Sequence, residues 1–118
     1  MNLKRAIQID PETRTITQVE IADRIEDWTK TLQCEHFEML PYPYIGTAML
    51  VDEEAKITRP NAASFLIRQG FNTPTRAKLR IIGRALVISQ TLRGKLAHVR
   101  PSIDDVASIV SWTTPAQN

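Results

Sequence analysis

Residues 81–89, with the sequence IIGRALVIS, constrain the fold more than any other stretch of the chain. Apolar side chains occupy both alternating sets of positions, and Arg84 is the one charged residue among them. Successive strand side chains point to opposite faces of a sheet, so a strand of this composition has both faces buried. Residues 45–51, IGTAMLV, have the same character. These two segments predict central strands of one sheet.

The N-terminal residues predict a β-hairpin. Residues 3–9 alternate in polarity, and residues 14–21 form a second, β-branched run. Between them lies DPET, residues 10–13, where proline has its φ already set for a turn and the preceding aspartate can accept a bond from the backbone ahead.

Two segments have helical periodicity. In residues 22–33 the apolar side chains Ile25, Trp28 and Leu32 follow one another at steps of three and four, and Asp23 is expected to cap the helix. Residues 102–112 begin with Ser102 followed three places later by Asp105, a variant of the capping box. We therefore expect one helix in each segment.

The remaining residues complete a predicted α+β fold. Weaker strands are expected at 35–40, 63–68 and 92–99, with a long loop at 69–80. The whole reads as one domain over 1–113, a mixed or antiparallel sheet of about five to six strands with two helices packed on it, followed by a flexible tail at 114–118. The expected buried side chains are Trp28, Leu32, Met49, Leu50, Leu86, Ile88 and Val106. Arg84 is expected near a strand end or paired with a carboxylate, because a buried unpaired charge is too costly.

Composition excludes several classes of protein. The chain has 118 residues, and its single cysteine, Cys34, excludes an internal disulfide and a cysteine-rich zinc site. No apolar run approaches the roughly 20 residues of a membrane helix, and no signal-peptide pattern follows the start. The sequence therefore favours a soluble, cytoplasmic protein with no membrane partner.

Charge is distributed unevenly along the chain. Residues 1–54 carry five cations and eleven anions, a net charge of −6, whereas residues 55–103 carry ten cations and no anion. Asp104 and Asp105 then bring the total to +2. Asymmetry of this kind is typical of chains that bind nucleic acid or an acidic partner.

The basic block has three interpretations. It can be a solvated face that pairs with the acidic half of the same chain, a surface for nucleic-acid backbone, or a surface for an acidic protein or a second copy of the chain. We expect a backbone contact without base specificity, because Arg76, Lys78 and Arg80 alternate in an extended segment and no helix has the character of a recognition helix. The expected contact residues are Arg76, Lys78, Arg80, Arg93 and Lys95.

Candidates for metal binding or catalysis are weak. Cys34, His36 and Glu38 alternate, but neighbours on one strand face are nearly 7 Å apart, too far to share an ion without help from elsewhere, such as His98. The acidic run Asp52 to Glu54 lacks the glycine and spacing of a calcium loop and is expected to form a turn. No phosphate loop, dinucleotide fingerprint or nucleophile motif is present. The expectation is no enzyme activity, no cofactor and no metal.

Several stretches together resemble a known family. IDPETRTITQVEI, VDEEA and GRALVI occur in that order over about residues 5–89. This pattern is similar to an uncharacterised domain family of unknown function found in phages, plasmids and bacterial genomes. The position of Ala55 is more often glycine in that family, and the stretch corresponding to 68–80 is usually shorter. The resemblance implies an α+β fold and a mobile-element setting, and it implies no activity.

Overall fold

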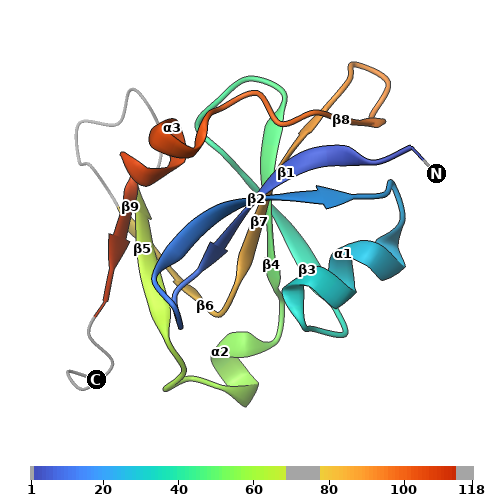
Figure 1. The fold of residues 1–118 in the computed structure, drawn as a ribbon. Coiled ribbons are helices and arrows are strands. Elements are labelled where there is room, and N and C mark those ends of the chain that lie inside the picture. The colour runs from blue at the N-terminus through green and yellow to red at the C-terminus, as the bar shows by residue number, and fades with distance from the viewer. Residues whose placement is uncertain (1, 69–77, 114–118) are drawn as a thin grey trace.

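A six-stranded antiparallel sheet lies at the centre of the computed structural model, which describes residues 2–68 and 78–113 (Figure 1). Its strands run in the order β2 (Thr15–Ile21), β1 (Lys4–Asp10), β7 (Ala85–Gln90), β4 (Thr47–Asp52) and β3 (Phe37–Pro41), and β8 (Leu96–Ala97) pairs with the end of β7. A second antiparallel sheet has the order β6 (Lys78–Ile82), β5 (Ser64–Arg68) and β9 (Val110–Trp112). The helices are α1 (Ile25–Leu32), α2 (Ala55–Thr58) and α3 (Ile103–Ala107).

The α+β prediction is confirmed in its coarse form. The described residues form a compact domain of nine strands and three short helices, so strands dominate more than expected. The strands form two antiparallel sheets, of six and three strands, so the sheet structure is larger than the single sheet of five to six strands that was predicted. The three-stranded sheet was not predicted as a separate layer.

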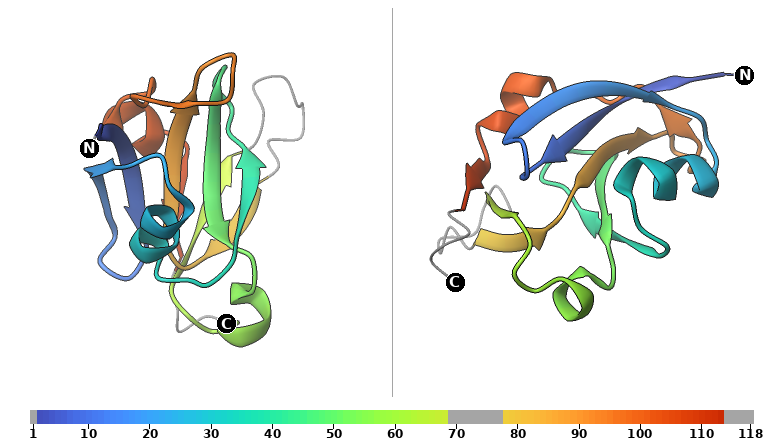
Figure 2. Two further views of the ribbon diagram at one scale, coloured as in Figure 1. Left: turned by 90° about the vertical axis from the view of Figure 1, so that its right-hand side faces the viewer. Right: turned by 60° about the horizontal axis from the view of Figure 1, so that its bottom comes forward.

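Both faces of the central strands are buried, each by a different layer. Leu50 lies opposite Leu86 in the register, and both pack toward α1 with Trp28 and Leu32. The alternate pair, Met49 opposite Val87, faces the three-stranded sheet and α3. Figure 2 shows α1 and the three-stranded sheet on opposite sides of β4 and β7. The apolar character of both faces in these segments follows from this sandwiched position.

The predicted core is confirmed. None of its seven side chains is more than 8% exposed: Trp28, Leu32, Met49, Leu50, Leu86, Ile88 and Val106. Trp28 combines burial with a satisfied polar group, because its Nε1 donates to the carbonyl oxygen of Ala22 at 2.9 Å. Each fully buried aliphatic side chain of this kind contributes roughly 1.5–3 kcal/mol.

The N-terminal hairpin and the first helix also form, with one correction. Asp10 Oδ1 accepts from the backbone N–H of Glu12 at 3.0 Å, as expected for the turn. The helix begins at Ile25, and Asp23 does not cap it. Instead Asp23 Oδ2 accepts from the N–H of Leu96 at 3.1 Å and ties the helix entry to β8.

The strand predicted over 81–89 is two strands. Gly83 has φ 84°, a conformation that disfavours residues with a Cβ, and the chain turns there from the three-stranded sheet into the central one. Arg84 lies at this corner, where its Nε is 3.4 Å from Asp10 Oδ2. The expected placement of Arg84, near a strand end and beside a carboxylate, is therefore confirmed.

The second predicted helix, 102–112, is wrong in its length. The capping box is present, since Ser102 and Asp105 exchange side-chain to backbone bonds, but α3 ends at Ala107. Residues 110–112 instead form β9 and pair with β5, with Val110 opposite Ile67. The β-branched run Ile109–Val110 fits a strand at the available edge of β5 better than further helical turns.

Two smaller predictions need correction, and an unpredicted helix follows the predicted acidic turn. The strand expected at 92–99 is reduced to β8, because residues 91–95 form a turn. In the loop expected at 69–80, residues 78–80 belong to β6 and residues 69–77 lie outside the described part of the chain. The acidic turn is followed by α2, where Ala55 is helical and buried. No helix in the described residues is long and apolar enough to cross a membrane.

Candidate nucleic-acid interface

The three-stranded sheet carries a cluster of cations on its outer face. Arg68 at the end of β5 lies directly opposite Lys78 at the start of β6, and Arg80 follows two residues later on the same face of β6. All three side chains belong to exposed residues. We call Arg68, Lys78 and Arg80 the basic sheet face.

The opposite face of the same strands is part of the core, which fixes the direction of the cations. Phe65 and Ile67 of β5 and Ile81 of β6 are buried against the central sheet. Because side chains alternate along a strand, their neighbours Arg68, Lys78 and Arg80 must point outward. A one-residue slip in register would bury charge, so the position of the basic sheet face is strongly determined.

Arg80 is oriented by a buried hydroxyl. Its Nε donates to Ser64 Oγ at 3.1 Å, and Ser64 is 3% exposed. Ser64 Oγ also lies 2.7 Å from Thr113 Oγ1, and the Thr113 hydroxyl in turn donates to the carbonyl oxygen of Ser64 at 2.8 Å. The two hydroxyl groups therefore link the end of β9 to β5, and Ser64 fixes the direction of the Arg80 Nε–H bond.

No carboxylate occurs in the described strands of this sheet. Like charges directly opposite one another on a sheet face destabilise the fold, so the juxtaposition of Arg68 and Lys78 is unfavourable for stability. Within the described residues neither side chain forms an ion pair. The arrangement is suited to a ligand that brings negative charge.

The remaining predicted contact residues do not join this face. Arg93 and Lys95 lie in the turn between β7 and β8, whereas β6 adjoins the other end of β7, and Figure 1 shows the two regions at opposite ends of that strand. Six residues of strand span about 20 Å. Arg76 lies outside the described residues. The structure thus brings together Lys78 and Arg80 of the predicted set and adds Arg68.

Arg68 is absent from the predicted contact residues because strand pairing, and not spacing along the sequence, places it beside Lys78. It is separated from Lys78 along the chain by the loop, and only the antiparallel register of β5 and β6 places the two opposite one another. The sequence held one signal for Arg68: it ends the segment 63–68, and its place in the polar/apolar alternation of that segment puts it on the polar face. Pairing with β6 brings this face beside Lys78 and Arg80.

Two other cations of the basic block are already paired. Arg59 Nη2 lies 2.8 Å from Asp52 Oδ2, and Arg84 Nε faces Asp10. Arg84 also donates to the carbonyl oxygen of Thr31 at 3.4 Å. Internal pairing with the acidic half of the chain therefore accounts for part of the block.

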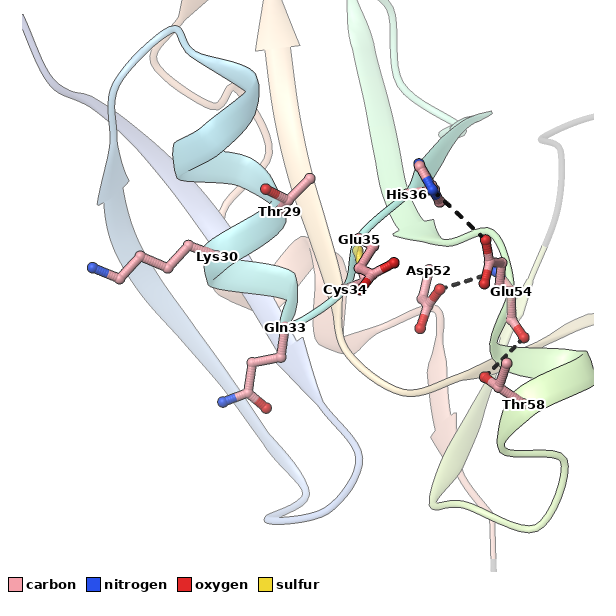
Figure 3. A pocket seen from close by; sticks show the side chains of 9 residues that line it. All are labelled: Thr29, Lys30, Gln33, Cys34, Glu35, His36, Asp52, Glu54 and Thr58. Carbon is pink, nitrogen blue, oxygen red and sulfur yellow. Dashed lines mark hydrogen bonds and ion pairs between the residues drawn. The ribbon is translucent and has the colours of Figure 1, made fainter.

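Two of the predicted metal candidates, Cys34 and His36, line an open cavity of about 510 Å³ between α1, the end of β4 and α2 (Figure 3). Glu54 also lines it: its Oε1 lies 3.9 Å from His36 Nε2, and its backbone N–H donates to Asp52 Oδ1 at 3.0 Å. Cys34 lines the same cavity, but Glu38 lines a different one. In residues 2–68 and 78–113 no three histidine, cysteine or acidic side chains are grouped to hold a metal ion.

The chemistry of this cavity does not favour a nucleophile. Burial, and next the negative charge of Asp52, raise the pKa of the Cys34 thiol, while Arg59 opposes them. The thiolate is the reactive form, so this environment suppresses it. His98 cannot assist, because its Nδ1 accepts from the backbone N–H of Arg5 at the far side of the central sheet.

Comparison with known proteins gives no relative to draw on. No family model matches the chain, and neither a curated protein nor a solved structure is significantly similar to it.

Proposed function

We propose that the protein is a non-enzymatic accessory domain whose basic sheet face binds nucleic-acid backbone without base specificity. The observation that carries the proposal is the register pairing of Arg68 with Lys78, next to Arg80, on strands without a carboxylate. A phosphate between these side chains replaces their mutual repulsion with two attractions. Phosphates also release counterions when cations neutralise them, which adds to the affinity.

Backbone contact is favoured over base recognition by what surrounds the cations. The aromatic residues of this sheet, Phe65 and Trp112, pack edge to face with their ring centroids 6.3 Å apart. Both belong to the hydrophobic core on the other face of the sheet. They are therefore not placed to stack on bases in the way that single-strand binding sheets do. α1 has Glu26 and Asp27 in its first turn, which would repel phosphates at the end of a groove-reading helix.

Fluorescence anisotropy with labelled single-stranded and double-stranded DNA and RNA over a salt series tests the proposal. The triple variant Arg68→Gln/Lys78→Gln/Arg80→Gln should bind more weakly, and the slope of log affinity against log salt should fall by about 2 for single strands. The matched control Arg93→Gln/Lys95→Gln/Arg100→Gln removes the same charge at the other end of β7. Undetectable binding by the wild type at low salt, or equal losses in both triple variants, would refute the proposal.

A second candidate function rests on the separation of charge over the surface. Asp52, Glu54 and Glu35 gather around the cavity of Figure 3, whereas the cations gather on the basic sheet face. Two copies could therefore associate through opposite charges. Sedimentation at low and high salt distinguishes this candidate, because charge-driven self-association weakens as salt rises.

The setting of the protein is part of the same proposal. The resemblance to an uncharacterised phage, plasmid and bacterial domain family supports a mobile-element origin, and it contributes no catalytic residue. The single cysteine supports a cytoplasmic location.

A further inference from the structure

Two exposed aliphatic side chains stand at neighbouring loop tips at the end of the central sheet. Ile45, before β4, is 86% exposed, and Leu92, after β7, is completely exposed. Both line one cavity of about 300 Å³. The loops are joined by a bond from the N–H of Gln90 to the carbonyl oxygen of Gly46 at 2.8 Å. Ile45 and Leu92 therefore line the same cavity, and the hydrogen bond between their loops holds the two loops together.

Arg100 supplies the charge of this cavity. A Cβ placed on Gly46 would lie 3.0 Å from Arg100 Nη1, so the guanidinium rests directly on the glycine backbone. Gly46 has φ 69°, which also favours glycine. The cavity lining contains no carboxylate, and within the described residues Arg100 has no ion pair. Arg93 and Lys95 lie on the same turn as Leu92 and add positive charge around it.

The backbone that presents Arg100 is held in place. Its N–H donates to Ser89 Oγ at 3.0 Å, and Ser89 is completely buried. Ser89 Oγ also lies 2.9 Å from Thr47 Oγ1 on the adjacent strand β4. The following Pro101 restricts Arg100 to extended backbone conformations. A partner would therefore meet an arginine whose backbone is already fixed, which reduces part of the entropy lost on binding.

We propose that this cavity binds a segment of another protein that carries a carboxylate beside a large apolar side chain. Arg100 can hold a carboxylate in a two-pronged bond, and Ile45 and Leu92 can enclose the neighbouring apolar group. Arginine is one of the residue types enriched among those that contribute most of the binding energy at protein interfaces. This site is separate from the basic sheet face and goes beyond the proposed nucleic-acid contact.

The cavity favours a protein segment over the other occupants. Nucleic-acid backbone would leave Ile45 and Leu92 in contact with phosphates and sugars, with no gain from their burial. A lipid surface would receive the two tips but would not use the hollow between them. A carboxylate flanked by an apolar side chain satisfies the guanidinium, the two walls and the excess of positive charge together.

Selection from a random octapeptide library displayed on phage, with the wild-type protein as bait, tests the proposal. Enriched peptides should place Asp or Glu next to Leu, Ile or Phe. A fluorescein-labelled synthetic copy of the enriched peptide should bind at least tenfold more weakly to Arg100→Gln and to Ile45→Ser/Leu92→Ser. Arg100→Lys should also bind weakly, because it keeps the charge and loses the planar fork.

The matched controls are Ile57→Ser, an 83% exposed isoleucine on α2, and Arg24→Gln, an exposed arginine beside α1. Both should bind the peptide as the wild type does, and circular dichroism melts should show that every variant is folded. An enriched peptide without an acidic residue, or equal binding by Arg100→Gln, would overturn the proposal. So would Leu92-dependent binding to phosphatidylserine vesicles without any peptide binding, or Arg100-dependent self-association seen by sedimentation, which would assign the site to lipid or to a second copy.

Discussion

Replacing Lys78 with glutamate should make the protein more stable and a poorer nucleic-acid binder. Arg68 lies directly opposite Lys78, so the change converts a repulsive cross-strand pair into an attractive one. Side chains at such positions have Cβ atoms about 4.5–5.5 Å apart, and an opposite-charge pair contributes roughly 0.2–1 kcal/mol. Removing the repulsion adds a similar amount, and both must be reduced because the residues are exposed and screened.

The expected net gain is about 0.5–1 kcal/mol at low salt. With an unfolding entropy of about 2.1 cal/mol/K per residue, a chain of this length has a total near 0.25 kcal/mol/K, so Tm should rise by about 2–4 °C. Calorimetry or circular dichroism melts at about 20 mM and about 500 mM salt, where charges are screened to different extents, would measure the rise in Tm. The gain should shrink at the higher salt.

Lys95→Glu is the control for this experiment. It makes the same change in charge within the turn between β7 and β8, where Lys95 is bonded across the turn to the uncharged Thr91, and should give no comparable rise in Tm. Lys78→Glu should also lose more oligonucleotide affinity than Lys95→Glu. An unchanged or lower Tm for Lys78→Glu would show that the pair of cations is not a source of instability, and the argument for a ligand there would fail.

Three further outcomes follow from the core and the titratable groups. Leu86→Ala should lower the free energy of unfolding by about 2–5 kcal/mol in urea titrations, and a loss below about 1 kcal/mol would contradict the packing of that buried side chain between the central sheet and α1. Cys34 should react with a thiol reagent at pH 8 more slowly than free cysteine, because burial and then Asp52 raise its pKa, and Asp52→Asn should speed the reaction; the reverse order would refute this cause. Burial, and then Asp105, raise the pKa of Tyr42, so in Tyr44→Phe the absorbance of tyrosinate should appear only with unfolding, and stability should fall as pH rises above about 10; ionisation of the folded variant near pH 10 would be inconsistent with it.

The core could be predicted from the sequence because it depends on local patterns. In β4 and β7 apolar side chains occupy both alternations, and only a strand covered on both faces satisfies that composition. The four-residue spacing of Trp28 and Leu32 likewise predicts one buried face of a helix, as observed in α1. Short connections explain only the antiparallel pairs β1–β2 and β3–β4, whereas β7 pairs with β1 and β4 across long stretches of chain.

The layer that carries the candidate site could not be predicted in the same way. Gly83 divides one apolar run between two sheets. The sequence of the run does not distinguish a glycine that turns the chain from a glycine that a single strand tolerates. Residues 110–112 form a strand because the edge of β5 is available to them, which is a tertiary effect. The helix predicted over residues 102–112 is therefore too long at its C-terminal end.

The basic block shows the same limit. Its cations form one group by position in the chain, but the fold distributes them among a sheet face, two internal ion pairs and a distant turn. The cluster that results depends on Arg68, which register and not spacing brings to Lys78. Charge asymmetry along the chain does not locate a charged surface, because the register of the strands decides which cations lie together.

The three-stranded sheet that carries the basic sheet face has β9 as one edge strand, beside β5. β9 has three residues, and the hydroxyl contact between Ser64 and Thr113 joins positions 49 residues apart in sequence. Contacts that close long loops form late, and a short edge strand opens more easily than the hairpin of β1 and β2. Amide protons of β9 should therefore exchange with solvent before those of β7. A ligand held on β5 and β6 would slow that exchange, so occupancy of the face would be recorded as local protection at the edge beside it.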